Sequence, residues 1–214
     1  MSATNRGVDR IEHDAYFTPP WCVARLLDDV TLPAGRWLDP CAGDGSIISA
    51  AAPVPRGVRW HAVERQERYR APLLRLTSAV WICDFFEWQF APGAFDVILT
   101  NPPYATAQAF IEKSLKVAKV VAMLLRLNFL GSAQREDFFQ AAGMPDVYVL
   151  PQRPTFSVDQ YGRAGTDATE YAWMLWHSDG GQLGRVQRLG VTPAADIAAH
   201  RRLVIERSAE VIGG

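Results

Sequence analysis

Residues 101–104, Asn-Pro-Pro-Tyr, combine a side-chain amide, two prolines and an aromatic ring in four consecutive positions. The prolines fix φ at two successive residues, so the turn that they form is stiff. The amide oxygen of Asn101 and the carbonyl oxygen of Pro102 can then face one point, where two acceptors suit a planar NH2 group. The ring of Tyr104 is placed to stack on the ring that carries this amine. The pattern predicts a site that binds and orients an amine on a flat group.

A second segment, residues 39–45 (Asp-Pro-Cys-Ala-Gly-Asp-Gly), lies between an expected strand and an expected helix. Its glycines let the backbone pass close to a ligand, and the helix that follows offers free N–H donors. The segment departs from the dinucleotide fingerprint because Ile48 takes the place of the third glycine, and it lacks the lysine of a phosphate-binding loop. Asp39 repels a pyrophosphate and suits a cationic group instead.

Two further acidic residues end the next two expected strands. Glu64 is placed to accept hydrogen bonds from ribose hydroxyls, although a solvated partner of the nearby arginines is an equally good interpretation. Asp84 can accept from the exocyclic amine of an adenine while Phe85 covers its ring; the alternative is that Asp84 caps the following turn.

These residues depend on a framework in which short β-rich runs alternate with helical stretches, which favours βαβ units and a mostly parallel sheet. The expected strands are 36–40, 58–63, 80–83, 95–100, 119–127, 146–150 and 169–176, and the expected helices are 21–30, 106–118, 132–142 and 194–211. Residues 178–190, rich in glycine and polar residues, are expected to form a linker or hairpin. The ends of the first four strands would line one cleft, as ligand sites in open α/β sheets do.

The amino-acid composition limits the classes of protein to which this chain can belong. The 214 residues include 49% apolar residues and carry 22 basic and 23 acidic side chains, for a net charge of −1. This balance excludes intrinsic disorder and wholesale electrostatic coating of nucleic acid. Three cysteines without Cys-x-x-Cys spacing argue against a disulfide framework or a zinc site, and the four histidines are scattered, so no metal is expected. With no apolar run near the length of a membrane span and no secretory signal, we expect a cytoplasmic protein.

In combination the motifs resemble those of the S-adenosylmethionine-dependent amino-methyltransferases, especially the DNA adenine-N6 methyltransferases. The family's methionine-end motif is similar to residues 39–45, its catalytic tetrapeptide matches residues 101–104, and an element before its first strand resembles residues 16–20 (Tyr-Phe-Thr-Pro-Pro). The resemblance covers about residues 14–177, and it is to the small, stand-alone enzymes often found in phages and mobile elements. It implies a Rossmann-like class I fold with seven strands, the seventh antiparallel, and helices on both faces.

The resemblance also implies a role for each matching residue. Asp39 would hold the methionine ammonium of the cofactor S-adenosylmethionine, Glu64 the ribose, and Asp84 with Phe85 the cofactor adenine. Cofactor contacts are implied for Tyr16, Phe17, Thr18, Pro19, Asp39, Cys41, Ala42, Gly43, Gly45, Glu64, Arg65, Asp84, Phe85 and Asn101. The catalytic loop would be Asn101, Pro102, Pro103 and Tyr104, with Tyr104 stacking on the target base.

A loop at residues 151–168, long for a compact domain, is a further candidate for substrate contact. Phe156 would form the opposite wall of the base pocket, while Arg153 and Arg163 would meet phosphates. The alternative is a surface loop with Phe156 packed on the core.

We expect residues 1–177 to form the catalytic domain and residues 178–214 a short C-terminal extension with a helix. That extension is too short for a separate target-recognition domain, so target reading would fall to loops, a homodimer partner or a second subunit. The expected activity is methyl transfer to N6 of adenine in DNA. Two alternatives stay open: the same chemistry on RNA adenine or a protein glutamine amide, and a non-catalytic cofactor-binding subunit of a methyltransferase complex.

Overall fold

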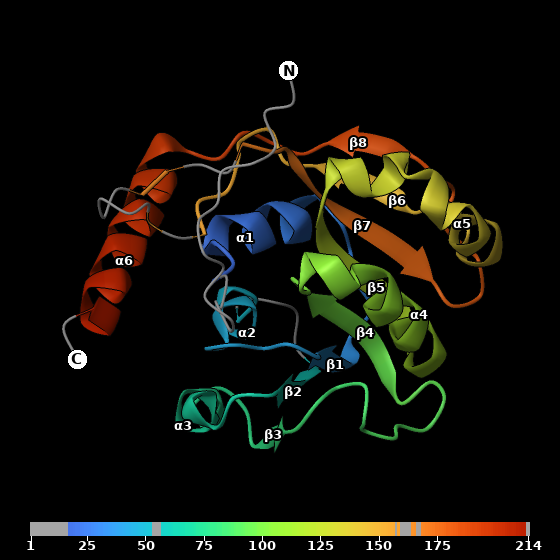
Figure 1. Ribbon diagram of the computed structural model, residues 1–214, viewed down its shortest axis with the longest axis horizontal. Helices are drawn as coiled ribbons and strands as arrows, with labels where there is room; N and C mark the ends of the chain where they lie inside the picture. Colours follow the sequence, from blue (N-terminus) through green and yellow to red (C-terminus); the bar gives the residue numbers. More distant parts are fainter. Residues whose placement is uncertain (1–16, 53–56, 157, 159–163, 166–167, 213–214) are drawn as a thin grey trace.

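A single mixed sheet organises the chain, as shown by a computed structural model that describes residues 17–52, 57–156, 158, 164–165 and 168–212 (Figure 1). The strands run in the order β3-β2-β1-β4-β5-β7-β6-β8. Their bounds are β1 Gly35–Asp39, β2 Val58–Glu64, β3 Ala79–Ile82, β4 Phe95–Thr100, β5 Ala118–Arg126, β6 Asp146–Val149, β7 Tyr171–His177 and β8 Val186–Arg188. β7 is antiparallel to both of its neighbours, and the other pairs are parallel. The α/β, Rossmann-like prediction with an antiparallel seventh strand is confirmed.

The described sheet has eight strands, one more than predicted. The additional strand, β8, lies within the segment 178–190 that was expected to be a linker or hairpin, and it pairs in parallel with β6. All three of its residues are exposed. A strand with no buried face carries no alternation of apolar and polar residues, so the pattern used to recognise strands is absent here.

Helices cover both faces of the sheet (Figure 1). Their bounds are α1 Pro20–Asp29, α2 Ser46–Ala50, α3 Arg70–Leu74, α4 Ala107–Val117, α5 Glu136–Ala142 and α6 Ala194–Ile212. α1 and α2 pack in one apolar cluster against one face, while α4 and α5 pack in a second cluster against the other. Ile197 of α6 joins the first cluster. Alternate residues of β4 contribute to the two apolar clusters on opposite faces of the sheet. Val97 and Leu99 face α1, and Ile98 between them faces α4.

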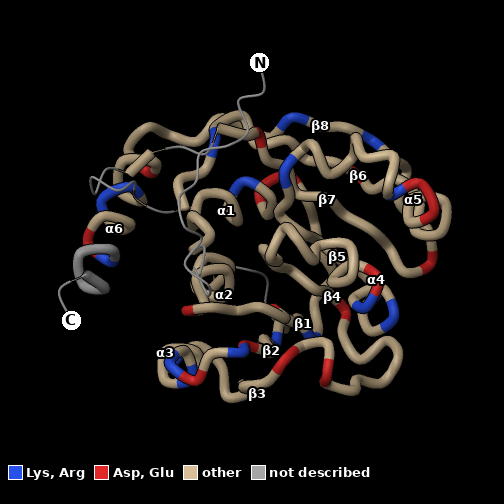
Figure 2. The backbone as a smooth tube through the Cα atoms, in the orientation of Figure 1, with Lys and Arg blue, Asp and Glu red and all other residues tan. Residues whose placement is uncertain are grey.

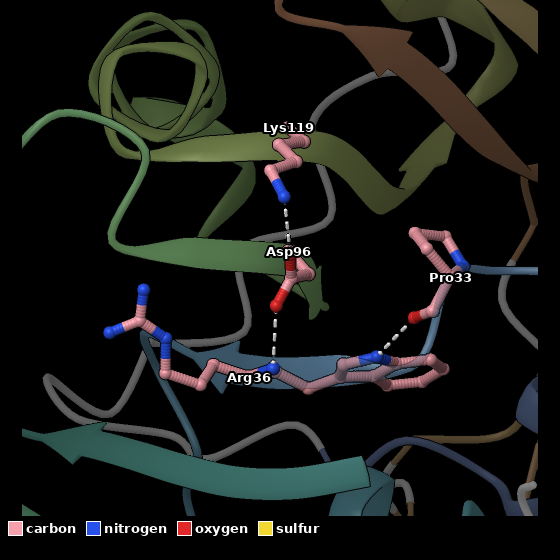
Figure 3. Close-up of polar contacts among 5 residues, drawn as sticks. Pro33, Arg36, Asp96 and Lys119 are labelled. Atoms are coloured by element: carbon pink, nitrogen blue, oxygen red, sulfur yellow. Dashed lines mark hydrogen bonds and ion pairs between the residues drawn. The ribbon is translucent and has the colours of Figure 1, made fainter. Parts of the chain in front are cut away.

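The amino-terminal edge of the sheet is fixed by Asp96 at the start of β4 (Figure 3). One carboxylate oxygen accepts the backbone N–H of Arg36 in β1 at 2.8 Å, and the other accepts the ammonium of Lys119 in β5 at 2.7 Å. Gly35 makes this contact possible, because a Cβ there would lie 2.1 Å from Oδ2 of Asp96. Three neighbouring strands are thus held in register at the edge opposite to their carboxyl ends.

Charged residues of both signs are interspersed along the described backbone (Figure 2). Among the described residues, no helix combines the length and the apolar character needed to cross a membrane.

Candidate active site

A cavity of about 730 Å³ opens where β1, β2, β3 and β4 end. Asp39 and Glu64 are the last residues of β1 and β2, while Asp84 and Asn101 follow β3 and β4 within two residues. Of the residues predicted to form the site, the cavity is lined by Phe17, Thr18, Asp39, Cys41, Ala42, Gly43, Glu64, Arg65, Asp84, Phe85, Asn101, Pro102, Pro103 and Tyr104. The sheet therefore brings together motifs that lie up to 87 residues apart in sequence, from Phe17 to Tyr104.

Asp39 is a fully buried carboxylate that is only half satisfied by the protein. Its Oδ1 accepts the hydroxyl of Thr100 at 2.7 Å and the backbone N–H of Cys41 at 3.2 Å, whereas its Oδ2 has no hydrogen-bond partner. Burial raises the pKa of this carboxyl to about 7, and the two hydrogen bonds oppose that rise. A buried acceptor without a partner at a cavity wall fits a cationic N–H donor from a ligand.

Cys41 joins the two strand ends that meet beside Asp39. Its thiol is hydrogen-bonded with Oγ1 of Thr100 at 2.9 Å and lies 3.6 Å from the backbone oxygen of Asn101. Burial and the neighbouring Asp39 raise the pKa of this thiol, so it stays protonated at neutral pH. The thiol therefore holds two loops together rather than supplying a nucleophile.

Glu64 fastens the glycine loop to the end of β2. Its Oε2 accepts the backbone N–H of Gly43 at 2.8 Å, and its Oε1 accepts the backbone N–H of Gln66 at 2.9 Å. Each oxygen keeps a second lone pair that can accept a hydroxyl. The side chain is almost buried and lines the cavity, so a ligand hydroxyl would meet a carboxylate that is already oriented.

The loop at 101–104 presents its polar groups to the same cavity. The hydroxyl of Tyr104 donates to Oδ1 of Asn101 at 3.1 Å, and Nδ2 of Asn101 is buried without a hydrogen-bond partner. The loop is followed at once by a 3-10 turn, Tyr104–Thr106, that leads into α4. An amide that retains unused hydrogen-bonding capacity at a cavity wall has room to bind a further polar group.

Arg126, which sequence reasoning did not single out, also lines the cavity. Its guanidinium lies 4.9 Å from the centre of the Tyr104 ring, and its Nε donates to the hydroxyl of Tyr171 at 3.0 Å. Arg126 and Tyr171 are register partners at the end of the β5–β7 pair. Because Arg126 ends an apolar central strand, its sequence position gives no sign that it contacts the loop at 101–104.

The far end of the cavity is aromatic. Phe85 is 1% exposed and stacks on Phe110 at 5.4 Å, while its neighbour Phe86 is 40% exposed. Oδ1 of Asp84 accepts the backbone N–H of Phe86 at 2.8 Å, and Arg65 lies 3.8 Å from Oδ2. Asp84 therefore caps the turn that follows β3, as the alternative interpretation expected. Phe86 and Phe110 also line the cavity, although the sequence did not indicate them.

Some predicted residues lie elsewhere. Pro19 precedes α1, where its carbonyl accepts the N–H of Cys22, and it does not line the cavity. Gly45 caps α2 with φ +84°, and a Cβ there would lie 2.3 Å from Leu76. Gly45 thus shapes the loop from behind rather than lining the cavity. Tyr16 lies outside the described residues.

Two of the predicted substrate residues of the loop 151–168, Arg153 and Phe156, do not line the cavity. Phe156 is buried in the core with its ring 5.2 Å from that of Tyr171, so it packs one layer behind Tyr104 instead of forming the opposite wall. Arg153 is exposed and does not line the cavity. Arg163 lies outside the described residues. The core-packing alternative for Phe156 is the correct one.

No group of three or more His, Cys, Asp or Glu side chains that could hold a metal ion occurs within the described part of the chain.

Comparison with known proteins identifies the fold. No protein-family model and no curated protein sequence matches the chain. The 23S rRNA methyltransferase ErmE matches with a TM-score of 0.51 at 14% identity, over 89% of this chain and 77% of that chain. Atu636 from Agrobacterium tumefaciens, assigned as an O-methyltransferase, matches with a TM-score of 0.54 at 15% identity. This match covers 86% of this chain and 97% of that chain.

A modification subunit from Vibrio vulnificus YJ016, assigned to a type I restriction enzyme, matches with a TM-score of 0.56 at 14% identity. The match covers 84% of this chain and 48% of that chain, so this chain spans about half of the subunit's length. At such low identities the likeness concerns the fold, and the chain has the Rossmann-like fold of methyltransferases.

Proposed function

We propose that the chain is an S-adenosylmethionine-dependent methyltransferase that modifies the N6 amine of adenine in DNA. The observation that carries this proposal is that two acceptors meet at one cavity: Oδ2 of Asp39, which is buried without a partner, and Oδ1 of Asn101, which now accepts the Tyr104 hydroxyl at 3.1 Å. The first suits the ammonium of a methionine, and the second can accept a hydrogen of a base amine. The buried Nδ2 of Asn101 is a donor and is left for an acceptor atom of the ligand.

The residues present fit the cofactor. Asp39 offers a buried acceptor to the ammonium, Glu64 offers oriented lone pairs to the ribose hydroxyls, and Phe86 offers a ring to the adenine. The cavity volume of about 730 Å³ lies in the usual range for ligand sites, roughly 300–1,000 Å³. S-adenosylmethionine supplies a methyl group on a positively charged sulfur, which is an electrophile that needs no further activation.

The loop at 101–104 would then bind and orient the target amine. The side-chain oxygen of Asn101 and the carbonyl of Pro102 accept the two hydrogens of the target amine, which directs the nitrogen lone pair toward the methyl donor. The Tyr104 hydroxyl, now bound to Asn101 at 3.1 Å, yields that acceptor to the amine. S-adenosylmethionine held by Asp39 and Glu64 would supply the methyl group, and Asn101 with Pro102 would present the amine nitrogen to it. The nitrogen would bond to the methyl carbon as the carbon–sulfur bond breaks, the sulfur would keep the bonding pair, and the extra amine proton would pass to solvent. Positioning and exclusion of water supply the rate enhancement.

A nucleotide target is supported by the wall around Tyr104. The aromatic ring suits a base, and the adjacent guanidinium of Arg126 is the type of group that meets a phosphate or a base edge. A target adenine in duplex DNA would have to leave the stack to reach this cavity. Target reading would fall to loops, a homodimer partner or a second subunit.

Parallel assays with one preparation test the proposal. Purified chain is incubated with cofactor labelled on the methyl group and, separately, with DNA, RNA and a glutamine-containing protein mixture. Incorporation into DNA that digests to N6-methyladenine supports the proposal. Incorporation only into RNA or protein keeps the chemistry and overturns the substrate, while tight cofactor binding without transfer to any substrate indicates a non-catalytic subunit.

A further inference from the structure

The C-terminal helix α6 is docked onto the catalytic core by buried side chains. Val204 is 3% exposed and His200 is 6% exposed, and Nε2 of His200 lies 2.8 Å from the carbonyl oxygen of Thr155. Ile197 packs against the apolar cluster that contains α1. Figure 1 shows α6 as a separate column beside α1 and α2, outside the sheet.

Arg207 extends from this helix to two segments that lie far away in sequence. Its Nη1 is bonded to Oδ2 of Asp44 at 2.5 Å, across 163 residues. Its guanidinium also lies 4.9 Å from the centre of the Phe17 ring. The side chains of Arg207 and Asp44 are 35% and 17% exposed, so the pair is partly shielded from water. A planar guanidinium can make both contacts at once, through its edge and its face.

Both partners of Arg207 form walls of the cavity. Phe17 precedes α1, and Asp44 belongs to the glycine loop between β1 and α2. Oδ1 of Asp44 accepts the backbone N–H of Ser46 at 3.0 Å and its hydroxyl at 2.5 Å, so Asp44 also fixes the start of α2. One side chain from α6 therefore couples two walls of the cavity that the sequence separates by 27 residues.

We propose that Arg207 is a positioning residue for the methyl donor, acting through the two cavity-wall residues that it contacts. Arg207 holds the glycine loop and Phe17 in the geometry that binds the cofactor, so the cofactor does not have to order them. Because these two walls are already ordered before the cofactor binds, binding loses no free energy in ordering them, and the affinity is higher. This inference rests on the proposed function, because it takes the cavity to bind S-adenosylmethionine.

The test is the cofactor dissociation constant of Arg207→Ala, measured by calorimetry on the full chain. We expect binding about tenfold weaker, which corresponds to about 1.4 kcal/mol of lost coupling. Arg207→Lys, which keeps the charge and loses the planar face, should fall between this variant and the wild type. Arg202→Ala on the same helix is the matched control, because Arg202 is exposed, and its dissociation constant should equal the wild-type value.

A double-mutant cycle separates positioning from general destabilisation. If Arg207 acts through Asp44, then Asp44→Asn and Arg207→Ala should each weaken cofactor binding, and the double variant should bind no more weakly than the worse single variant. With saturating cofactor, the KM for DNA of Arg207→Ala should stay at the wild-type value. A wild-type dissociation constant in Arg207→Ala, or fully additive effects in the cycle, overturns the inference. Absence of cofactor binding by the wild type would instead overturn the proposed function.

Discussion

Thr100 donates its hydroxyl hydrogen to Oδ1 of Asp39 across 2.7 Å, and this bond leaves Oδ2 as the buried oxygen without a partner. The two residues end adjacent parallel strands, β1 and β4. Because Thr100 occupies Oδ1, the Asp39 carboxylate offers a ligand in the cavity its other oxygen, Oδ2.

The first prediction concerns the pH dependence of cofactor binding. The pKa of Asp39 is raised to about 7 by burial, so the carboxyl is increasingly neutral below pH 7 in the free protein. Holding a cation requires the charged form. Affinity should therefore be highest between about pH 7 and pH 8. It should fall by up to about tenfold per pH unit below pH 7, the slope for one proton on Asp39, and fall again above about pH 8 as the ammonium of the ligand loses its proton. Calorimetry across pH 5 to 9 measures this profile, and a flat profile would contradict the role of Asp39.

The second prediction is that Thr100→Val moves this profile toward higher pH. The Thr100 hydrogen bond lowers the Asp39 pKa, so its removal leaves burial less opposed and raises the pKa further. The midpoint of the affinity profile should shift upward relative to wild type. Thr77→Val is a matched control, since the Thr77 hydroxyl donates to the carbonyl of Trp60 away from the cavity. Equal midpoints in Thr100→Val and wild type would refute the coupling.

The third prediction is that Asp39→Asn stabilises the free protein and abolishes cofactor binding. A folded-state pKa above the unfolded value means that the folded state holds the proton longer, so Asp39 lowers stability as pH rises from about 4 to about 7. Asp39→Asn removes this cost and should stabilise the free protein at pH 8 by about 2–4 kcal/mol. It should also abolish measurable cofactor binding. Denaturant unfolding at pH 4 and pH 8 tests the sign: the gain should be present at pH 8 and nearly absent at pH 4.

The fourth prediction separates the ring of Tyr104 from its hydroxyl. Tyr104→Ala should weaken binding of target-containing DNA by about 1–3 kcal/mol, the usual contribution of one base–aromatic stack. Tyr104→Phe keeps the ring and should retain DNA affinity. Tyr148→Phe on β6 serves as a control outside the cavity lining. Equal DNA affinity of Tyr104→Ala and wild type in a fluorescence-anisotropy titration would show that Tyr104 does not stack on the base.

The fifth prediction concerns Glu64, whose two oxygens accept the backbone N–H groups of Gly43 and Gln66 at the cavity. Glu64→Gln has one acceptor oxygen and one donor nitrogen, so it loses one of these bonds and orients the ribose less well. We expect cofactor affinity to fall by about 1.5–3 kcal/mol, the scale for hydrogen bonds to a charged group. Glu67→Gln, three residues along and exposed, should bind as the wild type does. Wild-type affinity in Glu64→Gln would place the ribose elsewhere.

The motifs that end β1, β2, β3 and β4 could be placed together from the sequence, because parallel strands in this fold end at one edge. The cavity confirms that they meet there. Periodicity located these strands because β1, β2 and β4 carry buried apolar residues and β3 carries partly buried ones. β8 escaped prediction because its three residues are all exposed.

Residues that reach the site by tertiary contact could not be predicted. Arg126 meets Tyr104 through the pairing of β5 with β7, and Arg207 meets Asp44 through the docking of a helix 163 residues away. Neither contact leaves a local sequence signal. Phe156 shows the converse error: an aromatic residue near a site-forming loop fits a pocket wall or a core equally well, and burial against Tyr171 decides for the core.

The central claim is that the 101–104 loop directs methyl transfer to the N6 amine of adenine in DNA. The most direct measurement is mass spectrometry of nucleosides from DNA incubated with cofactor and with either wild-type chain or Asn101→Ala, with cofactor affinity measured for both. We predict N6-methyladenine with the wild type, a loss of about 100-fold or more in Asn101→Ala, and equal cofactor affinity within a factor of about two. N6-methyladenine formed at the wild-type rate by Asn101→Ala, or none formed by a wild-type chain that methylates RNA or protein, would contradict the account.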